Sequence, residues 1–355
     1  MDRQISLKQI FRIAGSFIAW VIGSGFATGQ EILQFFSSYG YKSYYVVFIN
    51  LIGFISIGYF LMKNGYEHKR DINFNCFSYY CGNRLGVFYT WLVTMTLLFL
   101  IPVLVAGGGA TLYEYYNINV YMGSAIMSIS VLAAYLIGFE RMIKIVSSIG
   151  PLIIIFSFLI GIFTVFEDYG NWQMISSYED KLISYGAAPH WVLSSFLYLG
   201  LNFFPSSAYF TMLGVSATSK NNLKLGAILG GLLIILSIVV VNTAIILNGD
   251  KTLGLNIPAL YLANKTSYVF GNIFSIMLIL GIFSSCSIMM WSVCSKFSPN
   301  SKKGNIMGAI VVAIFAYILS LFSFGKLIAT IYPIIGYIGL CFIAMVIYRG
   351  RKKYI

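Results

Sequence analysis

The sequence predicts an all-α protein that crosses a membrane many times, and three observations carry this prediction. Of the 355 residues, 59% are hydrophobic and only 10% are charged, against about 25% charged residues in a soluble domain. The mean hydropathy is +0.83. The apolar residues form long continuous runs, whereas membrane β-barrels alternate apolar and polar residues. A soluble enzyme, a nucleic-acid-binding domain and a disordered chain are therefore excluded.

Ten apolar stretches are long enough to cross about 30 Å of hydrocarbon as helices of about 20 residues. They are residues 9–37, 43–62, 85–113, 119–139, 144–166, 190–215, 222–247, 268–294, 304–323 and 327–348. Because the connecting segments are short, we expect residues 1–355 to form a single transmembrane domain.

The basic residues orient these stretches. With the N-terminus in the cytoplasm, 18 of the 23 Lys and Arg residues fall on the cytoplasmic side. This distribution satisfies the positive-inside rule, with both termini in the cytoplasm. We therefore expect a multi-pass protein of the bacterial plasma membrane. The net charge of +12 predicts contact with anionic membrane lipids, and not with nucleic acid.

The first stretch, Phe11 to Phe36, has a polar, glycine-rich middle: Gly23, Ser24, Gly25, Gly29, Gln30 and Glu31. Each glycine weakens a helix by about 1 kcal/mol relative to alanine. Unwound backbone at membrane depth occurs only where protein buries it or where it lines a cavity. We expect a half-helix to about Ile22, an unwound segment, and a second half-helix to Phe36. The alternative is that Gly25 and Gly29 only permit close helix packing.

Glu31 is the acidic residue that the sequence places clearly within a span. A carboxylate at that depth is costly unless it is paired, hydrated or protonated, which makes Glu31 a candidate functional residue. Its side chain would bind a solute amine or a cation, or carry a proton. The structural alternative is that Glu31 caps the neighbouring unwound backbone.

A second interruption is expected in the sixth stretch, between Tyr198 and Ser207. Pro205 removes a helical N–H, and Gly200 and Asn202 tolerate non-helical backbone. The alternative is an ordinary proline kink. Five stretches separate the two interruptions, so the halves 8–166 and 189–348 would have inverted topologies. Interrupted helices at corresponding positions of two inverted halves indicate a transporter binding site near the bilayer midplane.

The string VIGSGFATGQEILQFF, together with ten apolar stretches and an Asn- and Pro-bearing sixth stretch, resembles the YkvI-type family of bacterial membrane proteins. That family resembles the amino acid–polyamine–organocation transporters. The resemblance implies the five-plus-five inverted repeat of LeuT, with helices 1 and 6 broken. It also implies secondary transport of an amino acid or a related amine.

The eighth stretch contains Gly281, Ser284 and Ser285. In sodium-coupled relatives of the LeuT fold, a sodium ion lies between the first and eighth helices. The resemblance places its ligands at the carbonyl groups of Ala19, Ile22 and Gly281 and at the hydroxyl groups of Ser284 and Ser285. Alternatively, these serines hydrogen-bond to their own helix.

The coupling ion is expected to be sodium in preference to a proton. Proton-coupled members of the superfamily can place a lysine from the fifth helix near the sodium position. The fifth stretch here has no lysine between Ile145 and Phe163. Glu31 keeps proton coupling open.

The sequence therefore predicts an ion-coupled secondary transporter of a small polar organic solute, with no cofactor other than Na⁺ or H⁺. The expected solute-binding residues come from the first stretch (Trp20, Gly23, Ser24, Gly25, Gln30 and Glu31) and from the sixth (Tyr198, Gly200, Asn202 and Phe203). No catalytic triad, zinc-ligand or nucleotide-binding motif occurs, so an enzyme is not expected. The alternative is a ligand-binding receptor subunit on the same fold, like the ten-span subunits of spore germination receptors. An ion channel is a third hypothesis.

On the outer side, Asn256 to Lys265 would form either a short helical lid or a plain interfacial loop. Glu114 would lie at the outer end of the third stretch, in contact with solvent.

Overall fold

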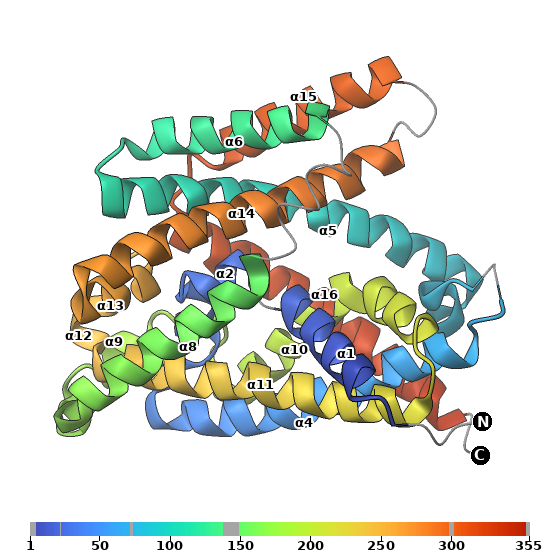
Figure 1. Cartoon of the computed structure of the whole chain (residues 1–355), viewed down its shortest axis with the longest axis horizontal. Coiled ribbons are helices and arrows are strands. Elements are labelled where there is room, and N and C mark those ends of the chain that lie inside the picture. The colour runs from blue at the N-terminus through green and yellow to red at the C-terminus, as the bar shows by residue number, and fades with distance from the viewer. Residues whose placement is uncertain (1–4, 22, 72–73, 138–148, 298–301, 353–355) are drawn as a thin grey trace.

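The computed structural model describes residues 5–21, 23–71, 74–137, 149–297 and 302–352. Within these ranges the chain is helical and forms no strand. Figure 1 shows long helices stacked in one bundle, with α6 (Val120–Ile137) and α15 (Lys302–Leu319) side by side at one edge. The start of α1 and the end of α16 lie at the same end of the bundle.

The remaining helices are α1 (Leu7–Val21), α2 (Ser24–Ala27), α3 (Gln30–Phe35), η1 (Ser37–Lys42), α4 (Ser43–Glu67), α5 (Cys76–Tyr116), α8 (Ile149–Glu167), η2 (Tyr169–Ser177), α9 (Glu179–Ile183), α10 (Trp191–Val215), α11 (Lys220–Leu247), α12 (Gly249–Thr252), α13 (Pro258–Thr266), α14 (Tyr268–Phe297) and α16 (Phe324–Lys352). Most of them lie within the predicted apolar stretches, and η2, α9, α12 and α13 lie between the stretches.

Six of the described helices are long and apolar enough to cross a membrane. A seventh span results if α8 and η2, which meet at an angle of 85°, are counted as one bent span. These helices make the chain a multi-pass membrane protein. The other predicted stretches also contain helices, but α1 and α15 are shorter, and α10 carries four serines, Asn202 and Pro205.

The predicted break in the first stretch is confirmed. Helix α1 ends at Val21, and the N–H of Gly23 donates to the Val21 carbonyl at 3.0 Å. The outer part is not one continuous half-helix, because Gly29 separates α2 from α3 with a φ of +82°. This left-handed conformation is accessible to glycine without a steric penalty. The Thr28 hydroxyl donates to the Gly25 carbonyl at 2.8 Å and stabilises this turn.

The prediction that helix 6 is broken is wrong, because α10 runs without interruption from Trp191 to Val215. Pro205 lies inside it, and neighbouring side chains hydrogen-bond to the carbonyl groups of this segment. The Asn202 amide donates to the Tyr198 carbonyl at 2.9 Å, and the Ser206 hydroxyl donates to the Asn202 carbonyl at 2.5 Å. Neither bond reaches the Leu201 carbonyl, which is the group that loses its helical N–H partner at Pro205, so α10 continues past the proline with one backbone hydrogen bond missing.

Gly200 serves helix packing. A Cβ there would lie 2.3 Å from the Gly336 carbonyl oxygen, and a Cβ at Gly339 would lie 2.1 Å from the Gly200 carbonyl oxygen. Helices α10 and α16 therefore cross in backbone contact, as small residues permit in membrane proteins.

An aromatic cluster links α1, α4 and α10 beside this crossing. Phe17, Phe54, Phe203 and Phe210 are fully buried, and the Phe17 and Phe210 rings meet edge-on at 4.7 Å. The Phe54 ring lies 5.2 Å from that of Phe203 and 6.0 Å from that of Tyr198. This aromatic core packs against α1 on the N-terminal side of its break.

Candidate functional site

A cavity of about 170 Å³ lies at the break of α1. Its walls come from five separate parts of the chain: the α1–α3 segment, α5, α10, α14 and α16. Of the residues predicted for the site, the cavity brings together Ala19, Trp20, Gly23, Gly25, Glu31, Asn202 and Ser285. Residues from sequence positions more than 180 apart thus meet where the sequence predicted a binding site.

Glu31 lies in the first turn of α3 and is 6% exposed. A Cβ on Gly25 would lie 2.6 Å from Glu31 Oε2 and 2.6 Å from Tyr332 Oη. The carboxylate and the phenol therefore converge on the bare Cα of Gly25. Glycine at this position makes room for both oxygen atoms.

Tyr198 stands beside this pair. Its side chain is fully buried, and its hydroxyl group neighbours the Glu31 carboxylate. Within the described residues, that hydroxyl forms no hydrogen bond of good geometry. Buried polar groups without partners are uncommon in native proteins, so the Tyr198 hydroxyl is available to adjust when a ligand or ion reaches Glu31.

The described wall of the cavity carries an acidic side chain but no basic one. Among the described residues that line it, Glu31 is the single carboxylate, and none is Lys, Arg or His. Much of the wall is hydrocarbon from Leu97, Leu100, Leu104, Leu201, Pro205 and Ile288. A carboxylate in apolar surroundings requires a cation, a proton or hydrogen bonds. The cavity therefore favours a positively charged group next to Glu31.

The residues predicted to hold sodium come from α1, from Ile22 directly after it, and from α14. Ala19 and Ser285 line the cavity, and Gly281 and Ser284 are buried on the same helix as Ser285. Ile22 lies outside the described residues. Oxygen ligands of this kind suit an alkali cation. Over the described part of the chain, no cluster of three or more His, Cys, Asp or Glu side chains forms a metal site.

Three predicted residues lie away from the cavity. The Gln30 amide donates to the Leu255 carbonyl, in the segment between α12 and α13. Phe203 belongs to the aromatic cluster, and Gly200 faces α16. The side chain of Ser24 is outside the described part of the structure.

The sequence did not indicate several residues that line the cavity. Tyr332 of α16 is the most important of them, because its hydroxyl lies beside Glu31. The leucines of α5 and Met289 of α14 also line the cavity. The sequence feature that could have indicated Tyr332 is the Tyr332-Pro333 pair in the middle of the last apolar stretch. A proline within a membrane span often accompanies irregular helix backbone at a functional site.

Helix α13 packs against the turn between α2 and α3, on one side of the site. In the segment predicted to form either a lid or a loop, Pro258–Thr266 form the helix α13, and the Ala259 N–H donates to the Thr28 carbonyl at 3.0 Å. Glu114 accepts hydrogen bonds from the N–H groups of Asn256, at 2.8 Å, and Ile257, at 3.1 Å. Glu114 therefore holds the start of α13 and is not merely solvated.

A buried ion pair holds the other end of α13. Lys265 Nζ lies 2.5 Å from Asp168 Oδ1. Asn248 joins the pair, donating to Asp168 Oδ2 at 2.7 Å and accepting from Lys265 at 3.0 Å. These contacts connect α13 to the ends of α8 and α11.

The known proteins that resemble this chain support its assignment as a membrane protein. No protein-family model matches the sequence. The uncharacterized membrane protein YkvI of Bacillus subtilis is 25% identical over 361 residues, which cover 96% of each chain. The uncharacterized protein YyaD of the same organism is 23% identical over 335 residues, 94% of each chain.

A manganese transporter of Eremococcus coleocola has a similar fold. Its TM-score is 0.51 at 15% sequence identity, over 87% of this chain and 69% of the transporter. At this identity the likeness concerns the fold alone. The chain is thus similar over nearly its whole length to two Bacillus proteins, one of them named a membrane protein, and in fold to a transporter.

Proposed function

We propose that the chain is an ion-coupled secondary transporter of a small organic solute with an ammonium group, an amino acid or a related amine. One observation carries the proposal: the cavity at the break of α1 presents the Glu31 carboxylate without any basic residue among the described residues that line it. An ammonium group is the natural partner of such a carboxylate.

The wall residues have distinct roles in this proposal. Glu31 pairs with the ammonium group, and the Tyr332 hydroxyl and the Asn202 amide hydrogen-bond to the polar part of the solute. The leucines of α5 contact its apolar part. The cavity of about 170 Å³ resembles in size a cavity of about 150 Å³ that holds benzene in another protein, so the solute is small.

A solute carboxylate would need a positive partner that the described wall does not supply. A sodium ion held by Ala19, Ile22, Gly281, Ser284 and Ser285 would supply it. Sodium binding would then be required for an amino acid but not for an amine. A proton on Glu31 remains the second coupling hypothesis.

Ten spans in a five-plus-five inverted repeat are part of the proposal. Its support is that each of the ten apolar stretches contains a helix and that the first is broken. With the outer side closed by α13, transport would proceed by rocking one group of helices against the other.

A divalent metal is the competing substrate, because the transporter of similar fold is a manganese transporter. The wall offers one carboxylate, one amide, hydroxyl groups and the Met289 thioether. Manganese sites are built mainly from carboxylate, carbonyl and water oxygens. A single carboxylate matches a monovalent cation better than a divalent one.

The test is uptake into proteoliposomes that contain the purified protein, with labelled apolar amino acids, their decarboxylated amines and Mn²⁺ as substrates. Removing one partner of a buried ion pair costs about 3–5 kcal/mol. We therefore expect Glu31→Gln to lower uptake at least about 100-fold. Glu167→Gln, which changes an exposed acid, is the matched control and should match the wild type.

Uptake by Glu31→Gln at the wild-type rate would overturn the proposal. Binding of a solute without uptake or counterflow would favour the receptor hypothesis. Uptake of Mn²⁺ alone would assign the cavity to metal transport.

A further inference from the structure

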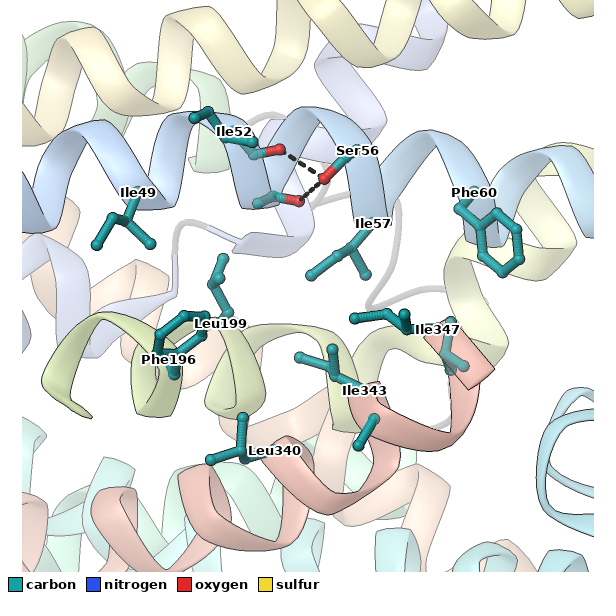
Figure 2. Close-up of a pocket in the computed structure, with 13 residues that line it drawn as sticks. Ile49, Ile52, Ser56, Ile57, Phe60, Phe196, Leu199, Leu340, Ile343 and Ile347 are labelled. Carbon is teal, nitrogen blue, oxygen red and sulfur yellow. Dashed lines mark hydrogen bonds between the residues drawn. The ribbon is translucent and has the colours of Figure 1, made fainter. Parts of the chain in front are cut away.

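A second and larger cavity, of about 820 Å³, lies between α4, α10 and α16. Figure 2 shows isoleucine and leucine side chains from the three helices converging on it. We refer to it as the α4–α10–α16 groove. None of the residues that line it belongs to the cavity at Glu31.

The wall of the groove is almost entirely hydrocarbon. Ser56 is the one polar side chain among the described residues that line it. Its hydroxyl donates to the carbonyl groups of Ile52, at 2.6 Å, and Gly53, at 3.4 Å, as Figure 2 shows. Because this hydroxyl is already hydrogen-bonded, the groove offers no polar anchor and fits a hydrocarbon chain.

The groove opens on a surface that would face lipid. Ile52 is 55% exposed, Ile347 48% and Phe196 41%. These three side chains come from the three helices that form the groove. In a membrane such a surface contacts acyl chains, so lipid reaches the groove directly.

The length of the groove corresponds to one leaflet. Figure 2 places Ile49 near one end and Phe60 and Ile347 near the other. The eleven helical steps from Ile49 to Phe60 on α4 span about 16 Å at 1.5 Å per residue. The hydrocarbon core measures about 30 Å. The groove thus accommodates the acyl chain of one leaflet, whereas a partner helix that crosses the membrane would need a longer one.

The floor of the groove is a close helix crossing. A Cβ on Gly53 would lie 2.5 Å from both terminal methyl groups of Leu199. Leu199 follows Tyr198, whose hydroxyl group neighbours Glu31.

Basic residues follow the Phe60 end of the groove. Lys63 lies one turn beyond Phe60 on α4, and Arg349 lies one turn beyond Val346 on α16. The Arg349 guanidinium lies 5.8 Å from the centre of the Tyr79 ring. The predicted orientation places this end at the cytoplasmic surface.

We propose that the α4–α10–α16 groove binds an anionic phospholipid of the cytoplasmic leaflet. One acyl chain fills the groove, and the phosphate of the headgroup contacts Lys63 and Arg349. Because its residues are separate from those of the Glu31 cavity, lipid binding is independent of the proposed transport function.

The test measures lipid retained by the detergent-purified full chain in native mass spectrometry. The probes are dioleoyl phosphatidylglycerol and dioleoyl phosphatidylcholine, which share their acyl chains and differ in charge. One lysine near a membrane surface contributes about 1 kcal/mol to the binding of anionic lipid. We expect Lys63→Gln to lower phosphatidylglycerol retention about fivefold and to leave phosphatidylcholine retention unchanged.

Ala344→Trp, at an exposed position that lines the groove, tests the acyl-chain site. Excluding two methylene groups of a lipid chain should lower retention of both lipids about tenfold. Leu236→Trp is the matched control, because Leu236 is an exposed apolar residue of α11 outside the groove. It should retain both lipids like the wild type.

Equal retention by Ala344→Trp and Leu236→Trp would overturn the proposal. So would a wild-type dimer that Ala344→Trp converts to a monomer, because a second copy of the chain would then occupy the groove. Equal retention of both lipids by the wild type would contradict the headgroup contact.

Discussion

The bare Cα of Gly25 lies where two side-chain oxygens meet. Any larger residue would place its Cβ 2.6 Å from both Glu31 Oε2 and Tyr332 Oη. The carboxylate and the phenol would then separate, and the cavity would lose the arrangement that we propose binds an ammonium group. The residue at position 25 therefore controls the shape of the site without providing a functional group.

We predict that Gly25→Ala folds and loses affinity for the transported solute. Overpacking a buried position typically costs about 1–3 kcal/mol, which corresponds to a loss of affinity of about 5- to 140-fold when the cost falls on the bound state. Isothermal titration against the solute found in the uptake assay measures this loss. Gly15→Ala in α1 is the control, because a Cβ there meets nothing within 4 Å. Equal affinities of the two variants would contradict this role of Gly25.

Glu31 and the glycines of the first stretch could be singled out from the sequence. The directions in which the polar side chains of that stretch point could not. Gln30 and Glu31 are neighbours, and successive helical residues point about 100° apart. Gln30 and Glu31 therefore could not both point into the cavity. The Gln30 amide instead donates a hydrogen bond to the Leu255 carbonyl, in the segment before α13. Tyr332 was not predicted, because an aromatic residue in an apolar stretch looks like any core residue until folding brings it to Glu31.

The α1–α3 segment and α10 contain different kinds of helix-breaking residue, a glycine in the first and a proline in the second. Gly29 adopts a φ of +82°, which ends one short helix and begins another. Pro205 removes a single N–H, and the side chains of Asn202 and Ser206 bond to carbonyl groups of the same segment. The sequence predicted both interruptions, but α10 is continuous from Trp191 to Val215, so the second prediction was wrong.

We predict that Pro205→Ala leaves the free energy of unfolding nearly unchanged, within about 1 kcal/mol, because α10 is already continuous and the new N–H can bond to Leu201. Gly200→Ala should lower it by about 1–3 kcal/mol, because its Cβ would lie 2.3 Å from the backbone oxygen of Gly336. Chemical unfolding in detergent compares the two variants. A Pro205→Ala variant that is as unstable as Gly200→Ala would indicate a functional break in α10.

Across the whole molecule, contacts between distant segments hold α13 in place. Asp168 and Lys265 are 97 residues apart in the sequence, and their ion pair connects α13 to the end of α8. Glu114 of α5 holds the other end of α13. The apolar stretches predicted where the helices lie. They could not predict these contacts, because the residues come from connecting segments without a periodic pattern.

We predict that Lys265→Met lowers the free energy of unfolding by about 3–5 kcal/mol, because it leaves the Asp168 carboxylate buried without its cation. The Asp168 side chain is 9% exposed and that of Lys265 is 22% exposed, so solvent screens this pair little. The double variant Asp168→Leu/Lys265→Met should recover most of the loss. Lys251→Met, at an exposed position of α12, is the control. Equal stability of Lys265→Met and Lys251→Met would show that the ion pair does not hold α13.

The central claim is that Glu31 binds a solute ammonium group in the cavity at the break of α1. The most direct test is thermal unfolding of the purified protein with apolar amino acids, each beside the amine that lacks its carboxyl group, in sodium chloride and in choline chloride. We predict that an amine raises the unfolding midpoint of the wild type in both salts. Its parent amino acid should do so only in sodium, and neither compound should stabilise Glu31→Gln. A solute that stabilises Glu31→Gln as much as the wild type would contradict the claim.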